Sequence, residues 1–276
     1  MNRRTFLAAT GVTGLGLTMS GLGTGAAAAQ ETDSVSIGGT DLQGWETVVG
    51  DGLYVAAGEL PVSLADIETH DLGTHSELVT NVRERNIMAH NIAFKRVIDD
   101  SLLNASHTCS YEFRLPVVPS INNASRNGQT VEGGFFVWDG AATRRDYGLG
   151  FQWILNPWDP QVGGIQKWHM SGWKTTHYVE PDSEWHRIDI EVDPRTRVAC
   201  LMFDGIEIDT VYTRRQKPGY WGTEIAGRLQ VEAISLFPDD GPNAPQHIVE
   251  ARNWQWTYAG GHGASPGPIL SPDYPL

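Results

Sequence analysis

The sequence predicts an all-β fold, either a sandwich or a barrel. Many short segments with alternating apolar and polar residues follow one another along the chain, and turns rich in Gly, Pro, Asn and Asp separate them. Helical periodicity is nearly absent. Of the 276 residues, those after position 29 suffice for one large domain with a sizeable core.

The clearest strands lie within residues 184–209. From His186 to Asp193, apolar and charged residues alternate, which predicts a strand with one buried face and one charged, solvent-exposed face. A proline turn at 193–196 leads into a return strand at Val198–Phe203. Asp204-Gly205 is a two-residue hairpin signal, because glycine accepts the positive φ of such turns, and a third strand is expected after it.

The rest of the domain follows the same pattern with two ambiguous regions. Residues 76–95 fit one or two strands, 91–95 among them, or a short helix, and residues 116–130 are predicted to be a long polar loop. The segment 30–40 is expected to be a polar leader, and the Gly- and Pro-rich tail 260–276 to be poorly ordered. Further strands are predicted at 44–49, 53–56, 109–115, 133–138, 148–155, 164–170, 229–236 and 248–258.

The first 29 residues predict export. Arg3 and Arg4 precede an apolar, glycine-rich run that ends at Ala26–Ala29, and this arrangement resembles a twin-arginine signal peptide cleaved near Ala29. A membrane anchor is the alternative, but the run is short and rich in Gly and Thr. We therefore expect a protein exported in its folded state, secreted or extracytoplasmic, with no membrane span in the mature chain and its domain at 30–259.

Charge and cysteine content narrow the possible partners. The formal net charge of −13 argues against nonspecific nucleic-acid binding. Cys109 and Cys200 each lie within a predicted strand. They could form one disulfide, because an exported protein meets an oxidising environment, or they could be two separate buried thiols. Two cysteines do not by themselves make a zinc site.

Three features together resemble the concanavalin A-like lectin/glucanase superfamily in its laminin-G-like form. They are the strand opened by Trp185-His186, the Asp204-Gly205 hairpin after an apolar strand, and the Trp-rich final strand around Trp254. The resemblance spans most of residues 40–258. It implies a two-sheet antiparallel jelly-roll β-sandwich whose concave face often binds glycans, but it does not imply an enzyme.

The run Arg187-Ile-Asp-Ile-Glu191 is similar to the catalytic strand of laminarinase-type hydrolases of this fold. In those enzymes the first and last positions are glutamates, the nucleophile and the acid/base, and residues four apart on a strand share one face. Here Arg187 takes the nucleophile position, and an arginine cannot act as a nucleophile. We expect a solvated strand face on which carboxylates flank Arg187.

A cluster of aromatic and polar residues predicts a carbohydrate-binding site in the middle of the chain. Aromatic rings stack on sugar rings, while amide and ammonium groups bind hydroxyls or a carboxylate. The alternative is that the tryptophans belong to the core. The predicted substrate-binding residues are Gln152, Trp158, Lys167, Trp168, Trp173 and Lys174, together with Arg144 and Tyr147 from a basic loop whose arginines suit a uronate or sulfate.

Residue chemistry within this cluster favours a polysaccharide lyase. β-Elimination next to a uronate carboxyl needs a base, for which His169 or Tyr178 is the candidate, and a group that neutralises the carboxylate, for which Gln166 or Arg145 is the candidate. A non-catalytic lectin-like or cell-surface module, and a glycoside hydrolase with carboxylates on separate strands, are the alternatives. The expected partner is an extracellular polysaccharide.

The final strand and the loops complete the predictions. By alternation, Glu250, Arg252, Trp254, Trp256 and Tyr258 are expected to share one face of the last strand. We assign this face to the core, with Glu250 and Arg252 at its rim, rather than to a sugar platform. The sequence requires no cofactor. Loop aspartates and carbonyl groups would be the ligands of a structural calcium ion, which is common in the resembled superfamily.

Overall fold

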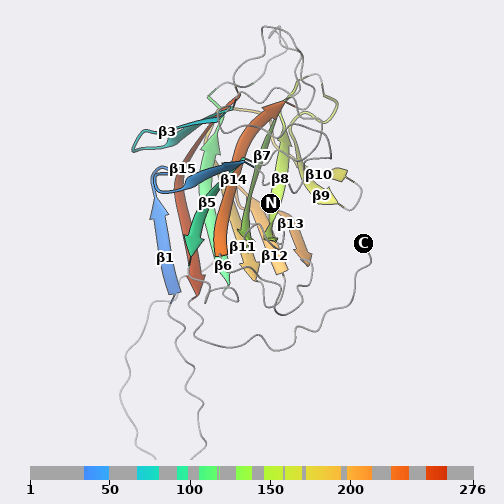
Figure 1. Cartoon of the computed structure of the whole chain (residues 1–276). Helices are drawn as coiled ribbons and strands as arrows, with labels where there is room; N and C mark the ends of the chain where they lie inside the picture. The colour runs from blue at the N-terminus through green and yellow to red at the C-terminus, as the bar shows by residue number, and fades with distance from the viewer. Residues whose placement is uncertain are drawn as a thin grey trace, which may run out of the picture. The chain divides into compact units, whose positions relative to one another are not determined.

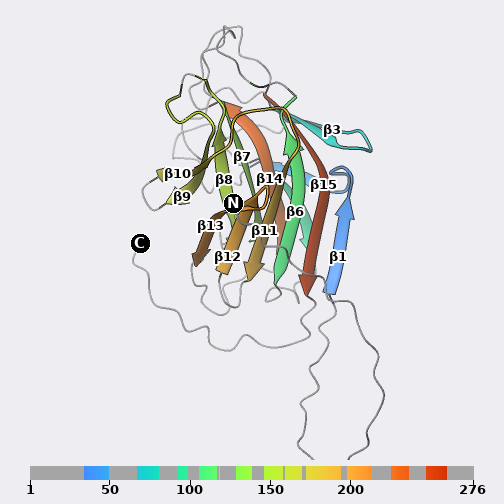
Figure 2. The ribbon, with the colours of Figure 1, turned by 180° about the vertical axis from the view of Figure 1, so that it is seen from behind.

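The computed structural model describes residues 34–49, 67–80, 92–98, 106–116, 118, 129–138, 146–157, 159–169, 172–193, 198–212, 225–235 and 247–259. Within these ranges the chain forms two antiparallel sheets, which can be followed in Figures 1 and 2. The structure confirms the predicted all-β, two-sheet sandwich. These residues include no helix long and apolar enough to cross a bilayer.

Sheet A has the strand order β13-β12-β11-β6-β15-β4-β3, and β1 pairs with β15 beyond the end of β4. The long strand β15 is therefore the centre of this sheet, with β6 along one side and β4 and then β1 along the other. Its strands are β1 (Ser34–Gly39), β3 (Ile67–Asp71), β4 (Ser76–Thr80), β6 (His107–Arg114), β11 (His186–Asp193), β12 (Val198–Phe203), β13 (Ile206–Tyr212) and β15 (His247–Ala259).

Sheet B has the order β10-β9-β8-β7-β14-β5-β2. The hairpins β7–β8, β8–β9 and β9–β10 place residues 129–178 side by side, whereas β14 joins from much later in the chain. Its strands are β2 (Glu46–Val49), β5 (Ile92–Ile98), β7 (Gln129–Trp138), β8 (Asp146–Ile154), β9 (Gly164–His169), β10 (Gly172–Tyr178) and β14 (Ile225–Ser235).

Aromatic side chains from both sheets form the core between them. Phe113 of β6 and Phe203 of β12 pack against Phe151 and Trp153 of β8, and all four are completely buried. The Tyr111 hydroxyl crosses the core: it donates to the Gln230 carbonyl and accepts from the Gly134 amide, each at 2.9 Å. Burial raises the pKa of this phenol well above its usual value, so the hydroxyl stays protonated and the two sheets stay linked.

The strands predicted from 184–209 are confirmed. In β11 the apolar positions are buried and Arg187 and Glu191 are exposed. The hairpin turn has positive φ angles of 49° at Asp204 and 76° at Gly205. The Asp204 carboxylate also accepts the Arg187 amide at 2.7 Å and contacts His186 Nδ1 at 2.8 Å, so this turn is bound to the neighbouring strand.

Several boundaries differ from the predictions. β1 lies within the segment expected to be a polar leader, because β15 supplies a partner for its backbone that local sequence cannot reveal. β7 begins inside the expected 116–130 loop, and β10 was not predicted. The ambiguous 91–95 segment belongs to a strand, β5. The predicted signal peptide, the strand at 53–56 and the tail at 260–276 lie outside the described residues.

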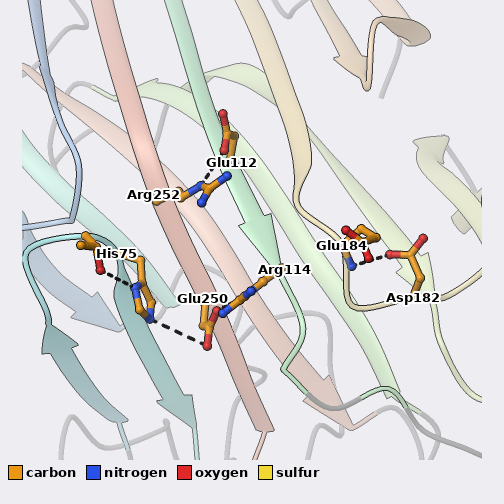
Figure 3. Close-up of polar contacts among 8 residues, drawn as sticks. His75, Glu112, Arg114, Asp182, Glu184, Glu250 and Arg252 are labelled. Carbon is orange, nitrogen blue, oxygen red and sulfur yellow. Dashed lines mark hydrogen bonds and ion pairs between the residues drawn. The ribbon is translucent and has the colours of Figure 1, made fainter.

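A bulge in β15 overturns the prediction that five alternating residues share one face. The register with β6 shifts between Arg252 and Gln255, and Asn253 has a positive φ of 51°. An extra residue on one strand reverses the alternation beyond it. Trp254, together with the two aromatic residues that follow it by alternation, therefore faces the core, as expected. Glu250 and Arg252 lie on the opposite, outward face of sheet A, beside Glu112 and Arg114 (Figure 3).

Cys109 and Cys200 are separate thiols. Cys109 is buried in the core on β6, whereas Cys200 lies on β12 and alternates with the buried Ala199 and Leu201. Strand β11 runs between them, so two strand spacings, roughly 9–10 Å, separate the strands. A disulfide requires Cα atoms within about 7 Å, so the structure favours the alternative of two thiols.

We expect the two thiols to differ in reactivity. Burial, and secondarily the nearby Asp189 carboxylate, raises the pKa of the Cys109 thiol well above its usual value, and a protonated, buried thiol does not react. Iodoacetamide should therefore label one site, Cys200, in the native protein and two sites in denaturant, as counted by mass spectrometry. Cys200→Ser should abolish native labelling. Two labelled thiols in the native wild type would contradict this packing.

Candidate functional site

The outward face of sheet B carries a row of polar side chains across neighbouring strands. On β7, Val131 and Phe135 point into the core, so Glu132 between them lies on the outward face. Cross-strand register places Gln152 of β8 opposite Glu132, and Gln166 of β9 opposite Gln152. All three of these polar side chains are buried.

Hydrogen bonds organise this row into two groups. In the first group, Gln152 Nε2 donates to one oxygen of the Glu132 carboxylate, and Gln230 Nε2 of β14 donates to the other oxygen at 3.4 Å. In the second, Gln166 Nε2 donates to Gln161 Oε1 at 2.6 Å and to Thr175 Oγ1 at 3.1 Å. Such networks hold amide groups in fixed orientations, because each buried polar atom needs its partner.

Two tryptophans flank the second group. Trp168 follows Gln166 by two residues on β9, and Trp173 is its register partner on β10, so both lie on the outward face. Their rings meet edge to face with centroids 5.6 Å apart. Trp168 is 49% exposed, unlike the buried tryptophans of the core. An exposed ring held by a second ring is a rigid apolar surface next to hydrogen-bonding amides.

The structure thus brings together four residues that the sequence predicted for a site. Gln152, Gln166, Trp168 and Trp173 occupy one face of three consecutive strands. The alternative assignment of these two tryptophans to the core is wrong, although it holds for Trp153, which is completely buried.

The structure does not bring Gln166, His169 and Tyr178 into one group. In the β9–β10 ladder His169 pairs with Gly172 next to the turn, whereas Tyr178 pairs with Gly164 at the other end. Five residues along β9 correspond to roughly 16 Å. Tyr178 is 68% exposed. Arg144, Arg145 and Trp158 lie outside the described residues, and only the backbones of Tyr147 and His169 are described.

Lys167, predicted to bind substrate, has a different role in the structure. Its ammonium group donates to the Asp209 carboxylate at 2.5 Å, and the Asp209 side chain is almost completely buried. This ion pair connects β9 of sheet B with β13 of sheet A. Removing Lys167 would leave a buried carboxylate unpaired, so we correct the prediction and assign Lys167 to the sandwich itself. Lys174 remains exposed on β10.

Sequence reasoning missed Glu132, the described carboxylate at the centre of this face. The strand was predicted to begin at Gly133, which left Glu132 unassigned between the expected loop at 116–130 and the strand, whereas β7 begins at Gln129. Alternation with Gly134 and Thr130 would have assigned it to the outward face once the strand was extended. Glu232 of β14 takes the register position directly opposite Glu132, so two glutamate positions on separate strands are neighbours.

Arg187 confirms the solvated alternative for the run that resembles a glucanase strand. Its guanidinium group binds the Asp189 carboxylate at 2.8–3.1 Å on the outward face of sheet A. This contact raises the pKa of the already basic guanidinium further, so the side chain remains charged. The run belongs to sheet A and supplies no residue to the face that carries Glu132 and Gln152.

Comparisons with known proteins give a likeness of fold. No protein-family model matches the chain, and no curated protein matches it. Alginate lyase Aly36B superposes with a TM-score of 0.46 and 9% identity over 80% of this chain and 96% of that one. A Bacteroides ovatus GH16 mixed-linkage glucan protein gives 0.40 and 8% over 76% and 93%. The carbohydrate recognition domain of Emp46p gives 0.40 and 10% over 76% and 98%. Solved structures of carbohydrate-related proteins therefore resemble this sandwich, and we carry no residue role over from them.

Proposed function

We propose that this protein is exported and binds an extracellular polysaccharide on the outward face of sheet B. The observation that supports this most is the half-exposed Trp168 ring, held by Trp173 beside the fixed amide of Gln166. Burying such a ring against a sugar removes apolar surface from water, while the neighbouring polar groups select the orientation of the sugar hydroxyls.

Cleavage of the bound glycan is the second part of the proposal. The sequence favours β-elimination of a uronate-containing polymer, with His169 or Tyr178 as base and Gln166 or Arg145 at the carboxylate. Of these, Gln166 lies in the proposed binding face. Its two amide N–H groups donate to Gln161 and Thr175, so Gln166 would stabilise a substrate carboxylate only by exchanging one of these bonds for the substrate.

A hydrolase that uses separate strands is favoured by a different observation. Glu132 and Glu232 are cross-strand neighbours on β7 and β14. Directly opposed residues have Cβ atoms about 4.5–5.5 Å apart, a spacing from which two glutamate side chains can bring their carboxyl groups to the about 5–5.5 Å that a retaining glycosidase needs. In this alternative Glu132, oriented by Gln152, and Glu232 would share the roles of acid/base and nucleophile.

One set of assays separates the three possibilities. The protein is incubated with alginate, pectin, laminarin and a mixed-linkage glucan. A new absorbance near about 235 nm would indicate the double bond formed by elimination and would support the lyase. Reducing-sugar release without that absorbance would support the hydrolase, and Glu132→Gln should then abolish it. Binding without turnover would support a lectin-like module. No binding to any polysaccharide in affinity electrophoresis would contradict the proposed function.

A further inference from the structure

A second polar cluster lies on the outward face of sheet A, away from the sheet B face. Register places His70 of β3, Glu77 of β4, Glu250 of β15 and Arg114 of β6 in one row across four strands. Glu250 belongs to this row because the β15 bulge reverses the alternation: Glu250 lies on the outward face, whereas the tryptophans beyond the bulge face the core. Figure 3 shows Glu250 between Arg114 and His75.

The row contains two glutamates in an unfavourable arrangement. Glu77 and Glu250 are directly opposed on neighbouring strands, and like charges in this position destabilise a sheet. The repulsion between the two carboxylates is stronger because one of them is buried: the Glu250 side chain is only 7% exposed. Arg114 forms an ion pair with Oε2 of Glu250. The other oxygen, Oε1, faces His75 Nε2 at 3.8 Å.

His75 is held in position by two further contacts. Its Nδ1 lies 3.0 Å from Thr74 Oγ1, and the edge of its ring meets Trp185 with centroids 6.2 Å apart. When Nδ1–H donates to the threonine hydroxyl, Nε2 carries a free lone pair directed toward Glu250. This is the arrangement of a metal-binding histidine whose second nitrogen is fixed by a hydrogen bond.

We propose that His75, Glu77 and Glu250 bind a divalent transition-metal ion, with Zn²⁺ the best fit. One ligand atom from each residue lies within 4.8 Å of the other two. With bonds of about 2.0–2.2 Å, a tetrahedral Zn²⁺ holds its ligand atoms roughly 3.3–3.6 Å apart, so the side chains must close around the ion to complete the site. Glu77 has the freedom for this movement, with a side chain 36% exposed.

The donor set and the charge favour this class of ion. An imidazole nitrogen with two carboxylates suits Zn²⁺ and its neighbours, whereas Ca²⁺ takes oxygen ligands alone. Glu68 adds a third carboxylate, 3.4 Å from His70 Nε2, while Arg114 is the cation that pairs with Glu250. Arg252 is paired with Glu112 and stacks on Trp185 at 3.8 Å. With neutral histidines the cluster is negatively charged, and a divalent cation relieves the opposition of Glu77 and Glu250.

Calorimetric titration of the untagged, chelator-treated protein with Zn²⁺ tests the site. We expect one equivalent to bind, and His75→Asn to weaken binding at least about tenfold. Glu250→Gln should do the same, but it also leaves Arg114 without its carboxylate, so His75→Asn is the deciding variant. The matched control is Glu191→Gln, an exposed acid on β11 of the same sheet, which should bind like the wild type.

Two further measurements complete the test. Co²⁺ should give visible absorption bands in the wild type that are lost in His75→Asn, and Ca²⁺ should give no binding heat. Zn²⁺ binding that is absent, or equal in wild type and His75→Asn, would overturn the proposal. Because polysaccharide binding is assigned to the other sheet, loss of the metal site should leave it unchanged.

Discussion

Trp256→Ala is expected to destabilise the protein by about 3–5 kcal/mol, the range for removing a large aromatic side chain from a packed core. Trp256 is completely buried, and its ring lies 5.5 Å from Phe135 of the opposite sheet and 5.3 Å from Tyr258. Its indole N–H also donates to His107 Nδ1 at 3.3 Å. Urea unfolding followed by circular dichroism would measure the loss as a lower midpoint.

The position beneath this ring offers a matched test. Gly227 of β14 lies against Trp256, and an added Cβ would come within 2.5 Å of the ring. Gly227→Ala alone should cost about 1–3 kcal/mol through overpacking. In the double variant the added methyl enters the space that the ring has left, so the two effects should be less than additive.

Gln255→Ala serves as the control for both variants. Gln255 is the exposed neighbour of Trp256 on β15, and its surface position predicts a change within about 0.5 kcal/mol. A loss below about 1 kcal/mol for Trp256→Ala, or full additivity with Gly227→Ala, would contradict the packing of β15 against β14 described here.

Trp168→Ala is expected to weaken polysaccharide binding by roughly 30-fold while leaving the unfolding midpoint almost unchanged. A half-exposed tryptophan contributes little to folding, but truncation of a tryptophan anchor in a binding site typically costs about 2 kcal/mol. Gln166→Ala should weaken binding less, because it removes a polar contact rather than the stacking surface. Affinity electrophoresis in the polysaccharide selected by the assays above would measure both.

The control for this prediction is Ile206→Ala. Ile206 is 44% exposed on β13 of the other sheet, so its exposure resembles that of Trp168 but its position does not. Equal binding by Trp168→Ala and wild type would remove the main support for the proposed site. Equal weakening by Ile206→Ala would show that the effect is not specific to the outward face of sheet B.

Predictions from the sequence succeeded where the signal was local. Strands β11, β12 and β13 follow from alternation and from the Asp204-Gly205 turn, since neighbouring residues decide both. Strand β1 was missed because its alternation is limited to Val35 and Ile37 before two glycines, and its backbone is paired by the distant β15. The face prediction for β15 failed at Asn253, where a single extra residue reverses the alternation without leaving a mark in the hydrophobic pattern.

For the candidate site, too, the sequence predicted what depends on nearby residues and missed what depends on distant ones. Gln166, Trp168 and Trp173 could be grouped from the sequence because they lie close together along the chain, although the hairpin of β9 and β10 that carries them was not predicted. Lys167 was assigned to substrate because its partner, Asp209, lies in another sheet and more than forty residues away along the chain. Glu132 was overlooked because the start of β7 was placed four residues too late, at Gly133 instead of Gln129.

The sequence by itself therefore determined the all-β class, the main strands and the Asp204-Gly205 hairpin, because period-two alternation and turn chemistry act over a few residues. Only the tertiary structure decided which faces meet. The tertiary structure placed Glu132 within hydrogen-bond distance of Gln152, formed the ion pair of Lys167 with Asp209, and placed His75 next to Glu250. The physical reason is that register between strands distant in sequence, and a bulge in one of them, depend on the packing of the whole sandwich rather than on any local pattern.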